Sequence, residues 1–170
     1  NPAKPSTLRD IDSNQEVSFV PMKAVDENLG KITDNEIKKL KSVSKGYTYF
    51  QNNWVLFAKI TPCMENGKSA IARDLVNGIG FGSTEFHTIV PSDEIIPEYI
   101  YHYLRQEKYR YDAKLSFRGA VGQQRVPPEF LRNTIIPLPK VNEQQKIVDK
   151  IEELFSVIDS CISNFEKSMH

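Results

Sequence analysis

The sequence predicts an α+β fold: a mixed or antiparallel β-sheet domain with packed helices, followed by one long C-terminal coiled-coil helix. Short apolar segments separated by turn-forming residues fill positions 47–90, as expected for strands. Near the C-terminus, apolar residues recur at alternating steps of four and three, the spacing of a helix that packs against another helix. Pro137 and Pro139 disfavour an earlier helix start, so we expect a body at 1–139 and a helix at 140–170.

Composition limits the class of protein. The 170 residues carry no net charge, with 39% hydrophobic and 26% charged residues, which excludes a disordered chain. No apolar run has the length of a membrane span or signal peptide, so we expect a cytoplasmic protein with no membrane partner. Cys63 and Cys161 lie in unrelated contexts and the histidines are scattered, so neither a disulfide nor a metal site is predicted.

The first half of the chain is expected to supply the sheet. Residues 17–22 alternate weakly as a strand, and Asp34 is expected to cap a short helix ending at Leu40. Further strands are predicted at 47–51, 54–60, 69–73, 79–82 and 86–90. Asn and Gly residues between them favour tight connections, with Asn66 and Gly67 as a hairpin signal.

The second half is expected to be mainly helical. Residues 92–114 form an amphipathic pattern entered through Pro97. Residues 116–126 contain two glycines and no strong period, which favours a shaped loop. A short helical turn at 127–131 and a final strand at 134–137 then lead to the C-terminal helix.

The C-terminal helix is expected to begin with a capping box of Asn142 and Gln145. Its apolar seam consists of Ile147, Ile151, Leu154, Ile158, Cys161 and Phe165. At about 1.5 Å per residue the seam spans roughly 27 Å, long enough to set a distance between two bodies. The pattern is equally consistent with an amphipathic helix that closes its own core.

Charge is unevenly distributed. Between Arg105 and Arg125, six basic residues face two acidic ones, for a local charge of +4, while each flank carries −2. Such a window is typical of a solvated helix face and also of a contact with nucleic acid.

Patterns for catalysis are weak. The glycines at 78–82 precede a β-type segment, whereas a dinucleotide or S-adenosylmethionine loop runs into a helix. Asp112 and Lys114 have residue types found in metal-dependent nucleases but fall at the end of a predicted helix. His87 and His102 lack an evident nucleophile. We therefore predict no catalytic residues.

Six motifs occur in the order found in one protein family. They are FVPM at 19–22, AKITPCMENGK at 58–68, GSTEFH at 82–87, GQQRV at 122–126, IPLP at 136–139 and EQQKIV at 143–148. Together they resemble the DNA specificity subunits of Type I restriction-modification systems. Family subunits usually carry two target-recognition domains and two spacer helices, whereas this chain has one of each.

The resemblance implies a DNA-binding, non-catalytic protein. The body would read one half of a split sequence in duplex DNA, and the helix would fix the spacing to the other half. Expected partners are methyltransferase (modification) subunits, restriction subunits and, through the helix, a second copy of the chain. S-adenosylmethionine, ATP and Mg²⁺ are expected only on the partner subunits.

Candidate DNA contacts lie in the polar loops. They are Lys45, Thr61, Asn66, Lys68, Arg118, Gln123, Gln124 and Arg125. Lysines are expected to contact phosphates, whereas Arg, Gln and Asn can read base edges. Two other classes stay open: a non-enzymatic protein-interaction module that dimerises through its helix, and a fragment of a methyltransferase or nuclease.

Overall fold

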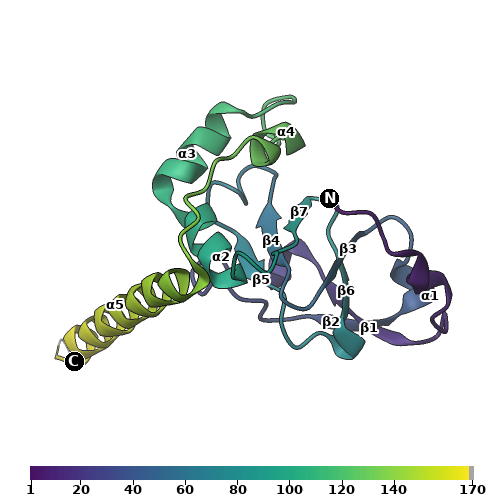
Figure 1. Ribbon diagram of the computed structural model, residues 1–170, viewed down its shortest axis with the longest axis horizontal. Helices are drawn as coiled ribbons and strands as arrows, with labels where there is room; N and C mark the ends of the chain where they lie inside the picture. Colours follow the sequence, from purple (N-terminus) through teal and green to yellow (C-terminus); the bar gives the residue numbers. More distant parts are fainter. Residues whose placement is uncertain (169–170) are drawn as a thin grey trace.

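Two β-sheets form the body in the computed structural model, which describes residues 1–168 (Figure 1). A four-stranded sheet has the order β2-β1-β6-β3; β1 and β6 run parallel and the other neighbours antiparallel. An antiparallel three-stranded sheet has the order β5-β4-β7. The strands are β1 (Glu16–Val20), β2 (Glu36–Lys39), β3 (Thr48–Gln51), β4 (Val55–Ala58), β5 (Ser69–Ile71), β6 (Ile79–Gly82) and β7 (Phe86–Ile89). The predicted α+β class is confirmed, with two sheets.

Three helices pack on the three-stranded sheet, the short first helix packs on the four-stranded sheet, and the last helix extends away from the body. They are α1 (Leu40–Val43), α2 (Pro97–Arg105), α3 (Glu107–Leu115), α4 (Pro128–Arg132) and α5 (Val141–Ser168), with short 3₁₀ turns at Ser6–Arg9, Met22–Ala24 and Val76–Gly78. In Figure 1, α3 and α4 lie above the sheets, and α5 leaves the body beside α2 and points away. Residues 169–170 of the predicted C-terminal helix lie outside the described residues.

Buried apolar side chains form three clusters. Phe50, Leu56 and Phe86 are fully buried in a cluster that draws on strands of both sheets. Phe57 packs with Leu104 and other residues of α2 and α3 in a second cluster. The third cluster joins the four-stranded sheet to α1. Burial of these side chains supplies the main driving force for folding of the body.

Residues Ile79–Gly82 of the glycine-rich segment form a strand, as predicted, and Gly78 ends the preceding 3₁₀ turn. Gly80 pairs with Phe50 across β3 and β6, and a Cβ atom at Gly80 would collide with the Phe50 ring. Because glycine leaves room for a buried aromatic ring, this segment serves packing in the sheet.

The helix predicted from Asp34 to Leu40 is wrong. Residues Glu36–Lys39 form β2, whose side chains alternate between exposed and half-buried, and pair antiparallel with β1. Only the four residues from Leu40 are helical. The short segment lacked a second apolar stripe, and pairing with the edge of β1 decides its conformation.

The single helix predicted at 92–114 is two helices, α2 and α3. Gln106 separates them with an extended backbone at φ −56° and ψ 136°. Leu104 and Tyr109 are both buried in the same cluster. In one continuous helix these two positions would lie about 140° apart around the axis, so the break lets both face the sheet.

The strand predicted at 134–137 is also wrong, because this segment pairs with no other strand among the described residues. Instead, the Tyr103 hydroxyl donates to the Ile135 carbonyl oxygen and the Tyr99 hydroxyl to that of Pro137, both at 3.1 Å. Proline lacks the N–H that a ladder requires, which explains why side chains of α2 hold this segment.

The start of α5 differs from the predicted capping box. Gln145 bonds forward to Asp149, and the fully buried Gln144 anchors the helix instead. The Gln144 amide donates to the carbonyl oxygens of Glu94 and Pro139 at 2.7 and 2.8 Å and accepts from the Ile96 N–H at 3.0 Å. One side chain thus fastens α5 to the segment that precedes α2.

Candidate nucleic-acid interface

Three connections meet at one end of the three-stranded sheet. They are residues 59–68 between β4 and β5, residues 83–85 between β6 and β7, and residues 116–126 between α3 and α4. The Thr61 N–H donates to the Gln124 carbonyl oxygen at 3.0 Å, and the Val126 N–H to that of Lys59 at 2.9 Å. The Lys59 N–H donates in turn to the Glu85 carbonyl oxygen at 2.9 Å. These main-chain bonds join distant segments into one surface, here called the loop surface.

Residues 118–125 form a small hairpin at the edge of the loop surface. Arg118 and Arg125 exchange main-chain hydrogen bonds of 3.0 and 2.9 Å at its base. Gly119 and Gly122 have φ of +114° and +80°, values that residues with a Cβ atom rarely adopt. At the tip, Val121 is 95% exposed. The glycines therefore shape a turn that carries its side chains outward.

Arg125 is engaged within the protein. Its Nε and Nη2 donate to the two carboxylate oxygens of Glu85 at 2.9 and 2.7 Å, and its Nη1 donates to the Gln123 carbonyl oxygen at 2.6 Å. The hydrogen bonds from Arg125 hold the pKa of the Glu85 carboxyl below its ordinary value. A forked ion pair of this kind fixes geometry as well as charge.

Lys68 and Thr61 also have partners in the protein. The Lys68 ammonium donates to the Val25 carbonyl oxygen at 2.8 Å and pairs with Glu27 at 2.9 Å. The Thr61 hydroxyl donates to Glu65, and the pKa of that carboxyl is lowered first by Lys114 and then by Thr61. These contacts brace the connection between β4 and β5 internally.

The structure separates the remaining candidates into two places. Asn66, Arg118 and Gln123 are exposed on the loop surface, while Gln124 is half-buried and accepts from Thr61 through its carbonyl oxygen. Lys45 is exposed in the turn between α1 and β3, beside the four-stranded sheet. The structure does not bring Lys45 together with the other candidates.

The basic window between Arg105 and Arg125 is mostly used for internal contacts. Arg105 donates to the carbonyl oxygens of Gly67 and Glu27, and Arg110 to that of Glu65. Lys108, Lys114 and Arg125 pair with Asp112, Glu65 and Glu85, respectively. Within residues 1–168, Arg118 is the basic side chain of this window left without such a partner.

Two residues of the loop surface were not among the predicted contacts. Lys59 is half-buried beside Glu85, and Glu85 holds Arg125. Both lie within motifs that carried the family resemblance. The sequence therefore contained both residues within recognisable motifs, but it did not show which residue each of them would contact.

The seam of α5 faces solvent over most of its length. Exposure is 41% at Ile147, 51% at Leu154, 50% at Ile158 and 65% at Phe165. Ile151 is half-buried and Cys161 is exposed. Ile162 adds a further exposed apolar side chain beside the seam, at 52%. By contrast, Val148 near the start of the helix is buried against the body.

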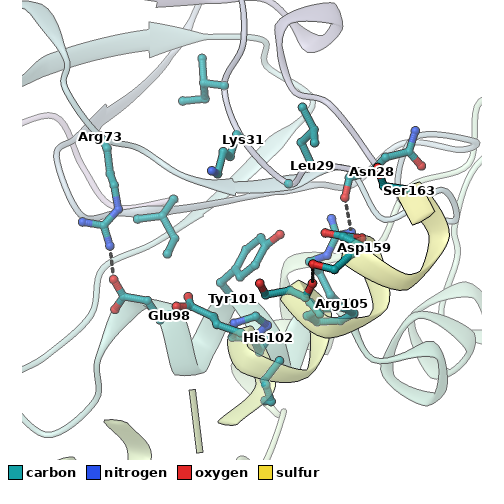
Figure 2. A pocket seen from close by; sticks show the side chains of 18 of the residues that line it. Asn28, Leu29, Lys31, Arg73, Glu98, Tyr101, His102, Arg105, Asp159 and Ser163 are labelled. Carbon is teal, nitrogen blue, oxygen red and sulfur yellow. Dashed lines mark hydrogen bonds and ion pairs between the residues drawn. The ribbon is translucent and has the colours of Figure 1, made fainter. Parts of the chain in front are cut away.

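A groove of about 1680 Å³ separates α5 from the loop and helix beside it (Figure 2). Tyr101, His102 and Arg105 line it from α2, and Asp159 and Ser163 are among the mainly polar residues that line it from the outer part of α5. Ile151 and Phe155 also line the groove, whereas beyond Phe155 the residues of α5 that line it are polar, and Ile158, Cys161 and Phe165 of the seam do not line it. This arrangement disfavours a helix that closes its own core and is consistent with a coiled coil.

Both histidines of the body make contacts within the fold. His87 Nε2 lies 2.8 Å from the Val126 carbonyl oxygen, and His102 stacks on Phe155. Burial lowers the pKa of both imidazoles. Across residues 1–168, no group of three His, Cys, Asp or Glu side chains is placed to hold a metal ion. No helix in the same part of the chain is both long and apolar enough to cross a membrane.

Comparison with known proteins assigns the chain to a family. Residues 3–162 match the family model of the Type I restriction modification DNA specificity domain, so the chain belongs to this family. Over 149 residues it is 40% identical to the specificity subunits of the Type I restriction enzymes EcoAI and EcoEI of Escherichia coli. The match covers 87% of this chain and 25% of each subunit, so the chain spans a quarter of their length. The resemblance inferred from the six motifs is confirmed.

Solved structures share the fold. The HsdS subunit from Thermoanaerobacter tengcongensis aligns with a TM-score of 0.74 at 22% identity, over 92% of this chain and 39% of that subunit. A chain from a study of complex assembly and conformational transition of the type I R-M system aligns with a TM-score of 0.75 at 22% identity, over 95% and 41%. The two-sheet body and the long helix are therefore an arrangement that these proteins have in common.

Proposed function

We propose that this chain is the DNA-reading part of a Type I specificity subunit, with the loop surface contacting one half of a split target sequence. The observation that carries the proposal is the joining of residues 59–68 and 116–126 into one surface, in a chain of this family. Exposed Arg118, Gln123 and Asn66 project from it. Arginine can bond guanine, and Gln or Asn can bond adenine, through two hydrogen bonds each in the major groove.

The helix α5 has a separate role in the proposal. Its exposed seam pairs with a second helix, which belongs either to the rest of a longer subunit or to a second copy of this chain, and so sets the distance between two half-sites. The same arm docks methyltransferase subunits, and restriction subunits join the complex. This chain contributes no catalytic group, and S-adenosylmethionine, ATP and Mg²⁺ act on the partner subunits in the cytoplasm.

Selection of duplexes from a randomised DNA pool tests the reading function. The purified chain is mixed with the pool at low salt, where a few phosphate contacts suffice for retention. We expect enrichment of a short motif of about three to five base pairs. Retention of duplexes without any enriched motif, in the presence of a Type I methyltransferase subunit as well as in its absence, would contradict sequence reading.

Variants of Arg118 separate reading of a base from attraction to phosphate. Arg118→Lys keeps the charge and loses the planar fork, so we expect reduced preference at one base pair with the salt dependence retained. Arg118→Ala should also weaken binding to all duplexes. Lys45→Ala is the matched control, because it removes a predicted contact that lies away from the loop surface. An effect of Lys45→Ala alone would move the interface to the four-stranded sheet.

Absence of DNA binding at low salt, with the methyltransferase subunit present, would favour the protein-interaction module. In that case the seam would still be expected to mediate self-association. Binding of S-adenosylmethionine by the chain alone, or Mg²⁺-dependent nicking, would instead indicate a catalytic fragment.

A further inference from the structure

The forked ion pair between Glu85 and Arg125 joins two separate parts of the loop surface. Glu85 ends the turn between β6 and β7, where its N–H donates to the Ser83 hydroxyl oxygen at 3.2 Å. Arg125 ends the 118–125 hairpin. Because β6 and β7 belong to different sheets, the ion pair ties the hairpin to the point where the chain crosses between them.

The guanidinium of Arg125 is occupied on its Nε/Nη2 edge, one of the two edges that can pair with a guanine. Reading guanine takes two parallel N–H groups, and the Nε and Nη2 groups of Arg125 already face both oxygens of Glu85. Its Nη1 closes the hairpin on the Gln123 carbonyl oxygen. Contact with a base edge through this fork would leave the Glu85 carboxylate, whose side chain is only 23% exposed, without its partner.

The main chain around the pair leads directly to the exposed candidates. The main-chain N–H and carbonyl oxygen of Arg125 both bond to the main chain of Arg118. The carbonyl oxygen of the adjacent Gln124 accepts from the Thr61 N–H. Because the main chain of Arg125 closes the base of the hairpin, release of its side chain from Glu85 would loosen the segment that carries Arg118 and Gln123. Alignment of reading groups before DNA arrives reduces the cost of ordering them on binding.

We propose that Glu85 and Arg125 are positioning residues, whose ion pair holds the 118–125 hairpin in its DNA-binding shape while neighbouring side chains contact the bases. This assignment rests on the proposed DNA-reading function. It gives Arg125 a different role from direct base reading and assigns Glu85 a role in recognition. An acidic residue beside a DNA surface is otherwise unfavourable, since it repels phosphate.

The direction in which Glu85→Gln changes the affinity for DNA distinguishes a positioning role from a simple charge effect. Glu85→Gln removes a negative charge, so charge alone predicts tighter DNA binding. Loss of positioning predicts the opposite, and we expect about tenfold weaker binding to the selected duplex with unchanged base preference. Arg125→Lys, which keeps the charge but loses the fork, should have the same effect. Glu129→Gln is the matched control, an exposed carboxylate on α4 that changes net charge equally.

Two further measurements complete the test on the full chain. Amide hydrogen exchange at 117–126 should be faster in both variants, with the unfolding midpoint close to that of the unmodified protein. The double variant should bind no more weakly than either single one, because both remove the same pair. Tighter binding by Glu85→Gln, or loss of preference at one base pair in Arg125→Lys alone, would overturn the proposal.

The outcome for the pair is separable from that for the proposed function. If the unmodified chain selects no duplex, DNA reading fails, while hydrogen exchange at 117–126 still tests whether the pair holds the hairpin. Unchanged exchange in both variants would overturn the positioning role on its own.

Discussion

The body and the outer part of α5, residues 154–168, differ in how far their side chains are paired or buried. In the body, charged groups are paired at short distance, as Lys68 is with Glu27 and Arg125 with Glu85. On the outer part of α5, large apolar side chains such as Phe165 and Ile162 stay more than half exposed. Isolated apolar residues on a surface are ordinary, whereas a continuous row of them marks a contact.

The contrast shows which region is complete within the described chain. The body pairs most of its charged side chains in the basic window and buries the rings of Phe50, Phe57, Phe81 and Phe86 in its own core. The outer part of α5 leaves most of its apolar side exposed, and apart from Phe155 its residues that line the groove beside α2 are polar. The apolar side of α5 therefore suits contact with a partner helix that the body does not provide.

The largest expected effect is on self-association through the seam. Leu154→Glu places a carboxylate among apolar side chains of the paired helices, and we expect dimer dissociation to be favoured by more than about a hundredfold. Ser156→Glu is the matched control, with the same charge on the groove side of the same helix. Analytical ultracentrifugation measures both variants, with the unfolding midpoint of the body expected to stay unchanged.

A monomeric unmodified chain at high concentration would show that the seam requires a different helix. Weakening by Ser156→Glu equal to that by Leu154→Glu would place the contact on the groove side instead. The second result would reverse the contrast between the two sides of α5.

The next effect concerns the junction between the two regions. Gln144→Ala removes the amide that contacts Glu94, Ile96 and Pro139 and leaves buried main-chain groups without partners. We expect a loss of about 1 to 3 kcal/mol in the free energy of unfolding, with faster hydrogen exchange in the first turns of α5. Gln145→Ala removes an exposed amide on the same turn and is the control. Equal effects of the two substitutions would show that Gln144 is not the anchor.

Much of the fold could be predicted because local pattern and tertiary pairing agree. The strands between Thr48 and Ile89 alternate with turn residues, and each found a partner strand. The wrong predictions fall where local pattern and tertiary pairing disagree. Glu36–Lys39 form β2 because the edge of β1 is available for pairing. Gln106 interrupts a helical pattern, so that Leu104 and Tyr109 share one cluster. Propensity carries no information about such distant partners.

The candidate site was predictable as a set of loops and not as a set of roles. Residue types identified Arg118 and Arg125 alike as base readers, yet one is exposed and the other is bound to Glu85. Lys45 was predicted as a contact together with the other loop residues, and it lies beside the four-stranded sheet. The roles depend on which side chain is already paired, and that is a property of the folded chain.

The smallest expected effect is a pH dependence of the junction. His102 stacks on Phe155 with ring centroids 6.5 Å apart, and burial lowers the pKa of its imidazole, while Glu152 raises it and Arg105 lowers it. The unfolded chain, with an ordinary histidine pKa of about 6.5, then binds the proton more readily than the folded one. The stability contribution is complete above that value and is lost as the pH falls from about 6.5 through the lowered pKa.

His102→Gln should therefore flatten the fall in unfolding free energy between about pH 7 and pH 5, leaving the part due to buried His87. Glu65 and Glu85, whose pKa values are lowered by their cationic partners, act in a separate and more acidic window. Denaturant titrations across the pH range, with hydrogen exchange of α5 as a local readout, measure the difference. Because Phe155 lies where α5 leaves the body, a slope unchanged by His102→Gln would mean that this stack does not help to hold the arm, and Gln144 and Val148 would remain as its attachment.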